Sequence, residues 1–206
     1  MKLLAVCIGA AQPTPGRKSS KTGFFKQPVD HPVMIGREGL AGDRIVNRKY
    51  HGGPDQAVYI EGAIDLAWWA EQLGKLIPPG TFGENLTIEG LDNRSVAVGD
   101  RFAIGEVLLE ITAARIPCAT FALRMDDPQF VKRYTSAGRP GAYARVLGEG
   151  VLKAGDAVIH TPYERERITM PEMIRTFGQR LEGAERARYL AAPIHHKLRA
   201  FLHDGA

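Results

Sequence analysis

Short apolar runs, separated by glycine and proline, fill most of the chain up to residue 162. Runs of this length are typical of strands, and many short strands with Gly-rich turns favour a barrel or a sandwich. The pattern predicts strands at 2–8, 27–35, 56–60, 84–88, 100–104, 106–114, 141–147 and 156–160. The run FAIGEVLLEI indicates a hairpin that turns at Gly105 and Glu106.

Two helices interrupt this pattern of strands. The run EGAIDLAWWAEQLG predicts a helix over 61–74, with an apolar side near Ile64, Trp68 and Leu73. The run DPQFVKRYTSAG predicts a second helix, with Asp127 as its cap, Pro128 in its first turn and Gly138 as its end.

From about Tyr163 the pattern becomes helical. Three short helices are expected, and the first opens at Thr169, with Glu172 three residues later as in a capping box. The charged run YERER before them indicates a linker. We therefore predict a mainly β body over 1–162 and a three-helix extension over 163–206.

Composition narrows the class of protein. The net charge of +4 and a pI near 9.1 favour anionic ligands, but no block of like charge marks a nucleic-acid groove. Two cysteines, Cys7 and Cys118, form no disulfide framework, which indicates a reducing, cytoplasmic environment. No apolar run is long enough to cross a membrane. The opening MKLLAVCIGAA could be a signal peptide, but its shortness and single Lys favour a buried strand.

The stretch ITAARIPCATF, at 111–121, carries the main candidate for chemistry. Pro117 has no amide hydrogen and forces an extended residue before it, so the strand should end by Ile116. Cys118 then lies on the following turn, either as buried filler or as a nucleophile or metal ligand. Arg115 would favour the thiolate, which binds soft metals. No Cys-x-x-Cys pair stands nearby, so structural zinc is not expected.

Three other segments carry polar and glycine residues that suit a ligand. Lys18, Lys21 and Thr22 lie in GRKSSKTGFFKQPV, which suits either a phosphate or a solvated loop. Arg44 and His51 lie in GLAGDRIVNRKYHGG, where paired glycines let a ligand approach the backbone.

Asn85, in TFGENL, could read a heterocycle with its amide or bond its own backbone. No phosphate loop, dinucleotide fingerprint or nucleophile elbow occurs, so any redox chemistry needs electrons from outside the chain.

Taken together, these segments resemble the MOSC family, named after the C-terminal domain of molybdenum cofactor sulfurase. The resemblance is to its stand-alone bacterial branch, that of the 6-hydroxylaminopurine resistance proteins, and covers about residues 3–160. The tail is similar to the three-helix extension of that branch. The residues that carry the resemblance are KTGFFKQPV, GLAGDR, HGGPDQAVY, TFGENL, VGDRFAIGEVLLEIT, RIPC and GAYARVLGEGVLKAGD.

The resemblance implies a β-barrel that binds the molybdenum cofactor, molybdopterin, with Cys118 as the thiolate on the metal. It implies reduction of N-hydroxylated compounds such as hydroxylaminopurines, a detoxification, with electrons from a separate reductase. Arg115 would hold the charge of the thiolate or cofactor, and the other cofactor contacts would be Lys18, Lys21, Thr22, Arg44, His51 and Asn85. The chain has no room for a pyridoxal phosphate domain, so sulfurase activity is not expected.

Two other functions remain open at this point. One is a non-catalytic carrier of the cofactor or of sulfur, and the other is a basic nucleic-acid module, which only the pI suggests. A homodimer is compatible with the sequence.

Overall fold

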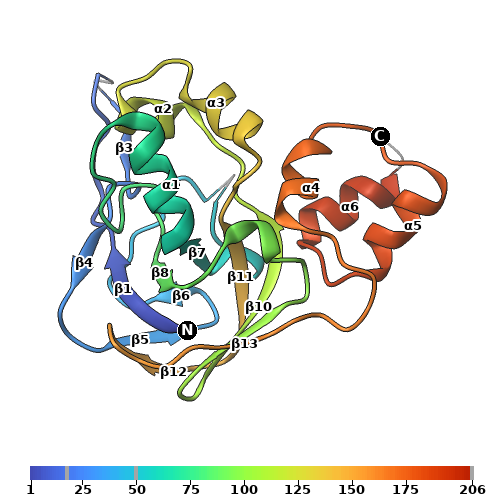
Figure 1. The fold of residues 1–206 in the computed structure, drawn as a ribbon, viewed down its shortest axis with the longest axis horizontal. Coiled ribbons are helices and arrows are strands. Elements are labelled where there is room, and N and C mark those ends of the chain that lie inside the picture. Colours follow the sequence, from blue (N-terminus) through green and yellow to red (C-terminus); the bar gives the residue numbers. More distant parts are fainter. Residues whose placement is uncertain (17–18, 49–50, 205–206) are drawn as a thin grey trace.

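The computed structural model describes residues 1–16, 19–48 and 51–204, and its largest feature is one eight-stranded sheet (Figure 1). Neighbouring strands follow the order β13, β9, β10, β11, β7, β8, β1, β4. Their bounds are β1 Lys2–Ile8, β4 Gln27–Val29, β7 Val58–Gly62, β8 Leu86–Glu89, β9 Arg101–Ile104, β10 Val107–Ala114, β11 Ala142–Gly148 and β13 Ile159–Thr161. Strands β7 and β8 pair in parallel and the others antiparallel, so the sheet is mixed.

The closed barrel that the resemblance implies is not confirmed, because the described strands form an open sheet with β13 and β4 at its edges. Backbone hydrogen bonds do join the start of β1 to the segment before β13. The Leu3 amide donates to Asp156 O at 2.9 Å, and the Val158 amide donates to Met1 O at 3.0 Å. The fold is therefore dominated by a mixed sheet that curls toward itself, with helices packed around it.

Two smaller sheets account for the strands that the sequence pattern missed. One holds β12 Gly150–Leu152, β5 Val33–Gly36 and β6 Gly39–Leu40, and the other pairs β2 Gln12–Pro13 with β3 Lys21–Thr22. The single strand expected over 27–35 is wrong, because a bend at 30–32 divides it into β4 and β5. Most of the missed strands have two or three residues, too few for an alternating pattern to be read.

The other predicted strands agree with the structure to within three residues at their ends. The predicted hairpin is confirmed, since Val107 of β10 lies opposite Ile104 of β9. Gly105 has a φ of 58° at its turn, a left-handed conformation that favours glycine.

The described residues contain six α-helices and two short 3₁₀ helices. Their bounds are η1 Pro54–Gln56, α1 Ala63–Leu73, η2 Asn93–Ser95, α2 Ala119–Met125, α3 Phe130–Ala137, α4 Met170–Arg175, α5 Gly183–Ala191 and α6 His196–Asp204. Helix α1 was predicted, but its apolar side was wrong: Leu66 and Trp69 are buried, whereas Ile64 is 43% exposed. Helix α3 begins later than predicted, because the Asp127 carboxylate caps the turn before it by accepting from the Gln129 amide. Gly138 ends α3 as expected.

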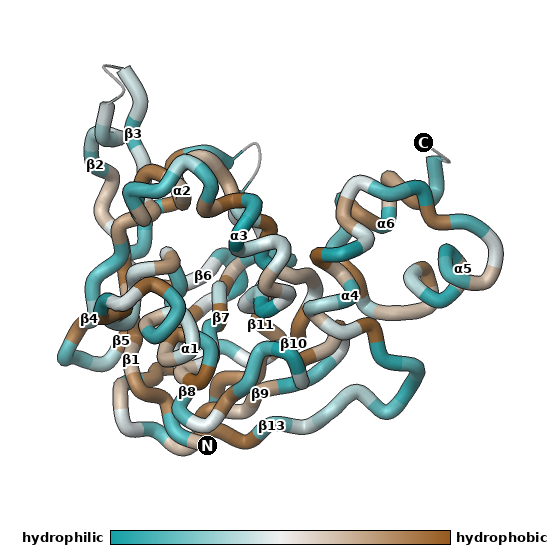
Figure 2. Tube along the Cα trace, turned by 45° about the horizontal axis from the view of Figure 1, so that its top comes forward, coloured by the Kyte–Doolittle hydropathy of each residue, from teal (hydrophilic) through white to brown (hydrophobic). Residues whose placement is uncertain are grey.

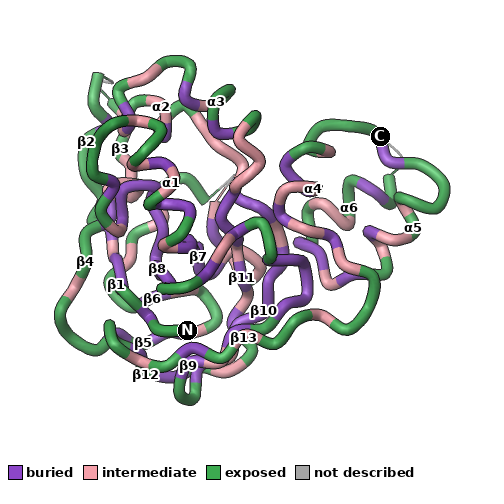
Figure 3. Tube along the Cα trace, viewed as in Figure 1, coloured by how far each residue is buried: buried purple, intermediate pink, exposed green. Residues whose placement is uncertain are grey.

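Two apolar clusters make the core, and buried residues follow the central strands in Figure 3. The larger cluster lies on the sheet. The smaller one is aromatic and packs α1, α2 and α3 together; its largest members are Trp69, Phe82, Phe121, Phe130 and Tyr134. The Phe121 and Phe130 ring centroids are 4.8 Å apart. Edge-to-face packing of this kind adds stability beyond that of the buried apolar area. The aromatic cluster therefore anchors α2, which follows Cys118.

The three predicted helices of the extension are α4, α5 and α6, which form a separate lobe in Figure 1. Thr169 caps α4 by accepting from the Glu172 amide at 3.3 Å, as the capping pattern predicted. The boundary at 162 stays a prediction, because apolar residues of the extension such as Met170 and Leu202 belong to the same cluster as the sheet. Figure 2 shows apolar and polar positions mixed along this lobe. Within the described ranges, no helix has both the length and the apolarity to cross a membrane.

Candidate functional site

A cavity of about 210 Å³ opens where the end of β10, the loops after β1 and β6, and the start of β7 come together. Its lining includes seven of the eight predicted site residues: Lys21, Thr22, Arg44, His51, Asn85, Arg115 and Cys118. The eighth, Lys18, lies outside the described residues. The sequence thus identified four segments of the chain that come together in space.

Cys118 is positioned by the end of β10 and the start of α2. Strand β10 ends at Ala114, two residues earlier than Pro117 required, and Cys118 is the N-cap residue of α2. Its carbonyl accepts from the Phe121 amide at 2.9 Å, and Phe121 is fully buried in the aromatic cluster. Cys118 itself is half-buried and faces the cavity, so the thiol is held firmly but is reachable.

Arg115 is the partner of this thiol. Its Nη2 atom lies 3.8 Å from Cys118 Sγ, and its Nη1 atom donates to the carbonyl of Ile116. The guanidinium is surrounded by rings: it lies 5.8 Å from the centroid of Phe24, 5.7 Å from Tyr59 and 5.6 Å from Phe121. Such contacts stabilise a cation, and only 2% of Arg115 is exposed.

The charge of Arg115 has no carboxylate to balance it among the described residues, since its side chain forms no ion pair there. A buried cation is costly without an anion nearby. Burial by itself raises the pKa of the Cys118 thiol, but the charge of Arg115 and the Phe121 amide outweigh burial, so the pKa lies below its ordinary value. The thiolate of Cys118, or an anionic ligand beside it, is therefore the natural counter-charge.

Polar groups on the β1 side of the cavity are bonded to one another. Lys26 forms an ion pair with Asp43, and both side chains are buried. The other Asp43 oxygen accepts from the Gly9 amide at 2.8 Å, and Asn85 Nδ2 donates to Asp43 at 3.0 Å. These bonds fix the loops that follow β1 and β6.

Asn85 lines the cavity as expected, but its amide serves the fold. The Oδ1 atom accepts from the Tyr59 amide at 3.1 Å, and Nδ2 donates to the Cys7 carbonyl at 3.2 Å as well as to Asp43. Neither of the two sequence interpretations describes these hydrogen bonds, because the side chain bonds other segments of the chain. Instead it ties β1, β7 and Asp43 together, and its amide is not free to read a heterocycle.

Lys21 and Arg44 are exposed residues at the mouth of the cavity. The close approach of two loops puts them there: a Cβ at Gly23 would lie 1.7 Å from the carbonyl oxygen of Arg44, so only glycine fits. The Thr22 hydroxyl takes part in a local turn, since its Oγ1 accepts from the Phe24 amide at 3.1 Å. Two cations at one mouth suit an anionic group such as a phosphate.

His51 lines the cavity beside Gly52, whose φ is 78°. Burial, together with the positive charges of Arg115 and Lys197, lowers the pKa of His51 to about 4. His51 is therefore neutral at pH 7, and it adds hydrogen-bonding capacity without charge. Lys197 belongs to α6, so the extension contributes to the electrostatics of the cavity.

Sequence reasoning missed several lining residues, chiefly Ser20, Phe24, Gln56, Tyr59 and Tyr143. Gln56 stands two residues after the Pro that follows the glycine pair, and this position was the sequence signal that could have identified it. Tyr143 lies opposite Tyr59 across β11 and β7, with ring centroids 5.4 Å apart, and only strand register brings the two together.

Comparison with known proteins agrees with this geometry. The family model described as the MOSC domain matches residues 47–159. YflK of Bacillus subtilis (strain 168) is 36% identical over 138 residues, which are 67% of this chain and 62% of YflK. YiiM of Escherichia coli (strain K12) is 30% identical over 170 residues, 81% of this chain and 75% of YiiM.

A protein named reductase from Gibberella moniliformis (strain M3125 / FGSC 7600) is 32% identical over 150 residues. These residues are 70% of this chain but 27% of that protein, so the chain spans about a quarter of its length. Among solved structures, YiiM from Geobacillus stearothermophilus superposes with a TM-score of 0.80 and 24% identity, covering 98% of this chain and 97% of that one. With the family model matching more than half of its length and relatives that are 36% and 30% identical, this chain belongs to the MOSC domain family.

Proposed function

We propose that this protein binds the molybdenum cofactor through Cys118 and reduces N-hydroxylated compounds, such as hydroxylaminopurines, with electrons from a separate reductase. The observation that carries the proposal is the reachable thiol of Cys118 beside Arg115, a buried cation without a carboxylate partner. A soft thiolate is the ligand type that such a metal takes in proteins. Membership of the MOSC family, and a relative named reductase, agree with this chemistry.

The residues present fit the cofactor. Cys118 would ligate the metal, Arg115 would balance the charge of the thiolate, and Lys21 and Arg44 would hold the phosphate at the mouth. The cavity of about 210 Å³ is smaller than the roughly 300–1,000 Å³ of most small-molecule sites. The cavity would therefore hold the reactive end of a ligand, and the exposed cations Lys21 and Arg44 would hold a phosphate. Within this set Asn85 acts as scaffold and not as a contact.

The reaction must balance electrons and protons. Reduction of R–NHOH breaks the N–O bond, consumes two electrons and two protons, and yields R–NH₂ and water. When bound, the cofactor supplies a metal that exchanges electron pairs. The side chains of the cavity orient the substrate, and two of them are uncharged at pH 7. His51 is neutral there, and burial raises the pKa of the Tyr143 hydroxyl, which therefore stays protonated. The electrons come from a reductase, because the chain carries no flavin or iron–sulfur segment.

The direct test is the metal content of protein purified from a host that makes the cofactor. Wild type and Cys7→Ser are expected to carry molybdenum and pterin near one equivalent, and Cys118→Ser to carry almost none. Cys7 is a matched control, because it is also a free cysteine near the cavity but is fully buried. Wild-type protein that never carries molybdenum would overturn the proposal.

Activity separates the enzyme from the carrier. With a flavin reductase and hydroxylaminopurine, the enzyme releases the amine at a rate that depends on Cys118. Bound molybdenum without amine formation, with any donor reductase, would leave a cofactor carrier as the function.

A further inference from the structure

Two side-chain oxygens of the cavity lining, Ser20 Oγ and the carboxamide oxygen of Gln56, have no partner among the described residues. The carboxamide oxygen of Gln56 is buried and forms no hydrogen bond in the described residues. An unpaired buried acceptor destabilises the fold, and Gln56 lines the cavity that holds Cys118. Rotation of the terminal amide about χ3 is soft, so a ligand in the cavity can reach this oxygen at little cost.

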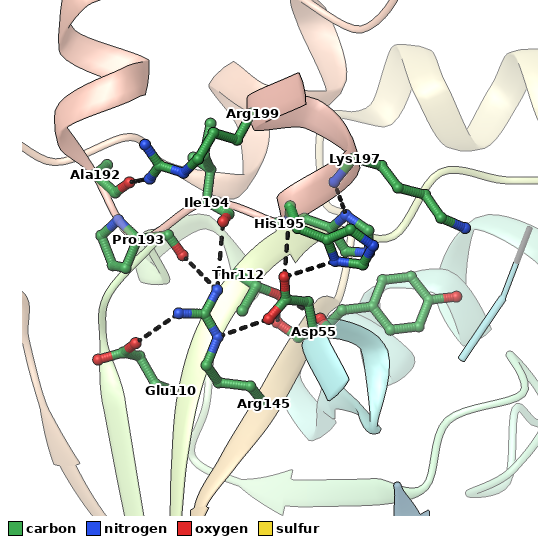
Figure 4. Close-up of polar contacts among 12 residues, drawn as sticks. Asp55, Glu110, Thr112, Arg145, Ala192, Pro193, Ile194, His195, Lys197 and Arg199 are labelled. Atoms are coloured by element: carbon green, nitrogen blue, oxygen red, sulfur yellow. Dashed lines mark hydrogen bonds and ion pairs between the residues drawn. The ribbon is translucent and has the colours of Figure 1, made fainter. Parts of the chain in front are cut away.

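Gln56 ends the short helix η1, whose position is fixed by contacts with the extension. The residue before it, Asp55, points toward the start of α6 (Figure 4). The Asp55 carboxylate accepts from the His196 amide at 2.8 Å and from Arg145 Nε at 2.9 Å. Thr112 Oγ1 donates to the Asp55 carbonyl at 2.6 Å. These bonds fix the backbone of η1, so Gln56 is ordered before a ligand arrives.

Aromatic side chains line the cavity near the same wall. Thr112 Oγ1 also lies 3.2 Å from the carbonyl of Tyr143, which places Tyr143 beside η1. The rings of Tyr143, Tyr59 and Phe24 all line the cavity. An aromatic lining of this kind favours a flat, aromatic ligand. An unpaired oxygen beside them favours a ligand that carries an N–H group at its edge.

We propose that Gln56 recognises an N–H group of an amino-substituted aromatic heterocycle bound in the cavity of Cys118. This inference rests on the proposed function, which supplies two heterocycles of this chemistry: the pterin of the cofactor and a purine substrate. A hydrogen bond to Gln56 replaces the partner that its oxygen lacks, and a ligand without an N–H group leaves the oxygen unpaired.

The experiment compares wild type, Gln56→Leu, Gln56→Glu and Gln27→Leu. Leucine keeps the size of the side chain and removes the acceptor, whereas glutamate keeps an acceptor oxygen. Gln27 is an exposed glutamine on β4 that does not line the cavity, so Gln27→Leu controls for the substitution itself. Each protein is measured for molybdenum and pterin content, for KM with hydroxylaminopurine and with hydroxylaminobenzene, and for adenine affinity by calorimetry.

Two results support the inference and identify the ligand. A severalfold loss of pterin in Gln56→Leu, restored in Gln56→Glu, assigns Gln56 to the cofactor. Unchanged pterin, with KM about tenfold higher for hydroxylaminopurine but not for hydroxylaminobenzene, assigns Gln56 to the substrate; tenfold is the usual effect of one neutral hydrogen bond.

Unchanged pterin with equal KM changes for both substrates overturns the inference, while the proposed function survives. Wild-type protein that carries no molybdenum overturns the proposed function, and adenine affinity by calorimetry then tests the role of Gln56 by itself. In that case, adenine affinity that is absent or equal in wild type and Gln56→Leu overturns the inference as well.

Discussion

Two walls of the same cavity differ in how their polar groups are used. On the β1 side, Lys26, Asp43 and Asn85 bond one another and the backbone. On the opposite side, Arg115 forms no ion pair with a carboxylate and the carboxamide oxygen of Gln56 has no hydrogen-bond partner within the described part of the chain. The hydrogen bonds of the first wall hold strands and loops together. The second keeps charge and hydrogen-bonding capacity for a ligand.

The two cysteines follow the same division. Burial raises the pKa of Cys7 to about 12, and the nearby charge of Glu84 adds to the rise. Arg115 acts in the opposite direction on Cys118, whose pKa is lowered. The same residue type thus has a raised pKa where it is fully buried near acids and a lowered pKa where it lies beside a cation.

The largest expected contrast is in alkylation of the two thiols. At pH 7 about 10⁻⁵ of Cys7 is thiolate, as follows from its pKa of about 12, against at least about 10⁻² of Cys118. We expect iodoacetamide to modify Cys118 at least about 10³-fold faster, measured by mass spectrometry of peptides from native protein. Equal rates for the two cysteines would remove the contrast between the walls.

Asn85→Ala tests the structural wall. The change removes hydrogen bonds to Tyr59, Cys7 and Asp43 and leaves buried partners unsatisfied, so we expect a loss of about 2–4 kcal/mol in the free energy of unfolding. Urea denaturation measures it. Asn47→Ala, an exposed asparagine of the same cavity, is the control and should change stability by less than about 0.5 kcal/mol. The idea fails should both variants unfold at the same urea concentration.

Arg115→Leu tests the reactive wall. Loss of the guanidinium removes the charge that favours the thiolate, so alkylation of Cys118 at pH 7 should slow roughly tenfold, the usual weight of a hydrogen bond to a charged group. Arg124→Leu is the control, because Arg124, on α2, contacts the ring of Phe25 and not the thiol. An alkylation rate that is insensitive to Arg115 but changes with Arg124 would contradict this assignment.

The smallest expected effect is the pH dependence that His51 adds. Its pKa is about 4 in the folded protein and about 6.5 in the unfolded chain, so the unfolded chain binds more protons between these values. Stability therefore falls as the pH drops from 6.5 toward 4, by about 1 kcal/mol at pH 5 after allowing for partial exposure.

His51→Gln should flatten this slope, measured as urea midpoints at pH 7.5 and pH 5. His203→Gln, at an exposed histidine of α6, should keep the wild-type slope. A wild-type slope that survives in His51→Gln would assign the effect to other groups.

Much of the fold was predictable from local pattern. The hairpin at Gly105, the end of α3 at Gly138 and the cap at Thr169 follow from backbone preferences of single residues. The apolar side of α1 was not predictable, because Trp69 is buried by aromatic residues that arrive from α2 and α3. The expected barrel depended on the short strands with Gly-rich turns, which favour a barrel and a sandwich alike, and on the resemblance; the described strands leave the sheet open.

By itself the sequence determined that a thiol follows a strand end next to an arginine, since Pro117 and the RIPC order are local. Tertiary structure alone decided which polar groups are satisfied and which stay free. Asn85 meets its partner Cys7 across 78 residues, and Asp55 meets His196 across 141. Hydrogen bonds act over about 3 Å in space and not along the chain, so only the folded chain separates the structural wall from the reactive one.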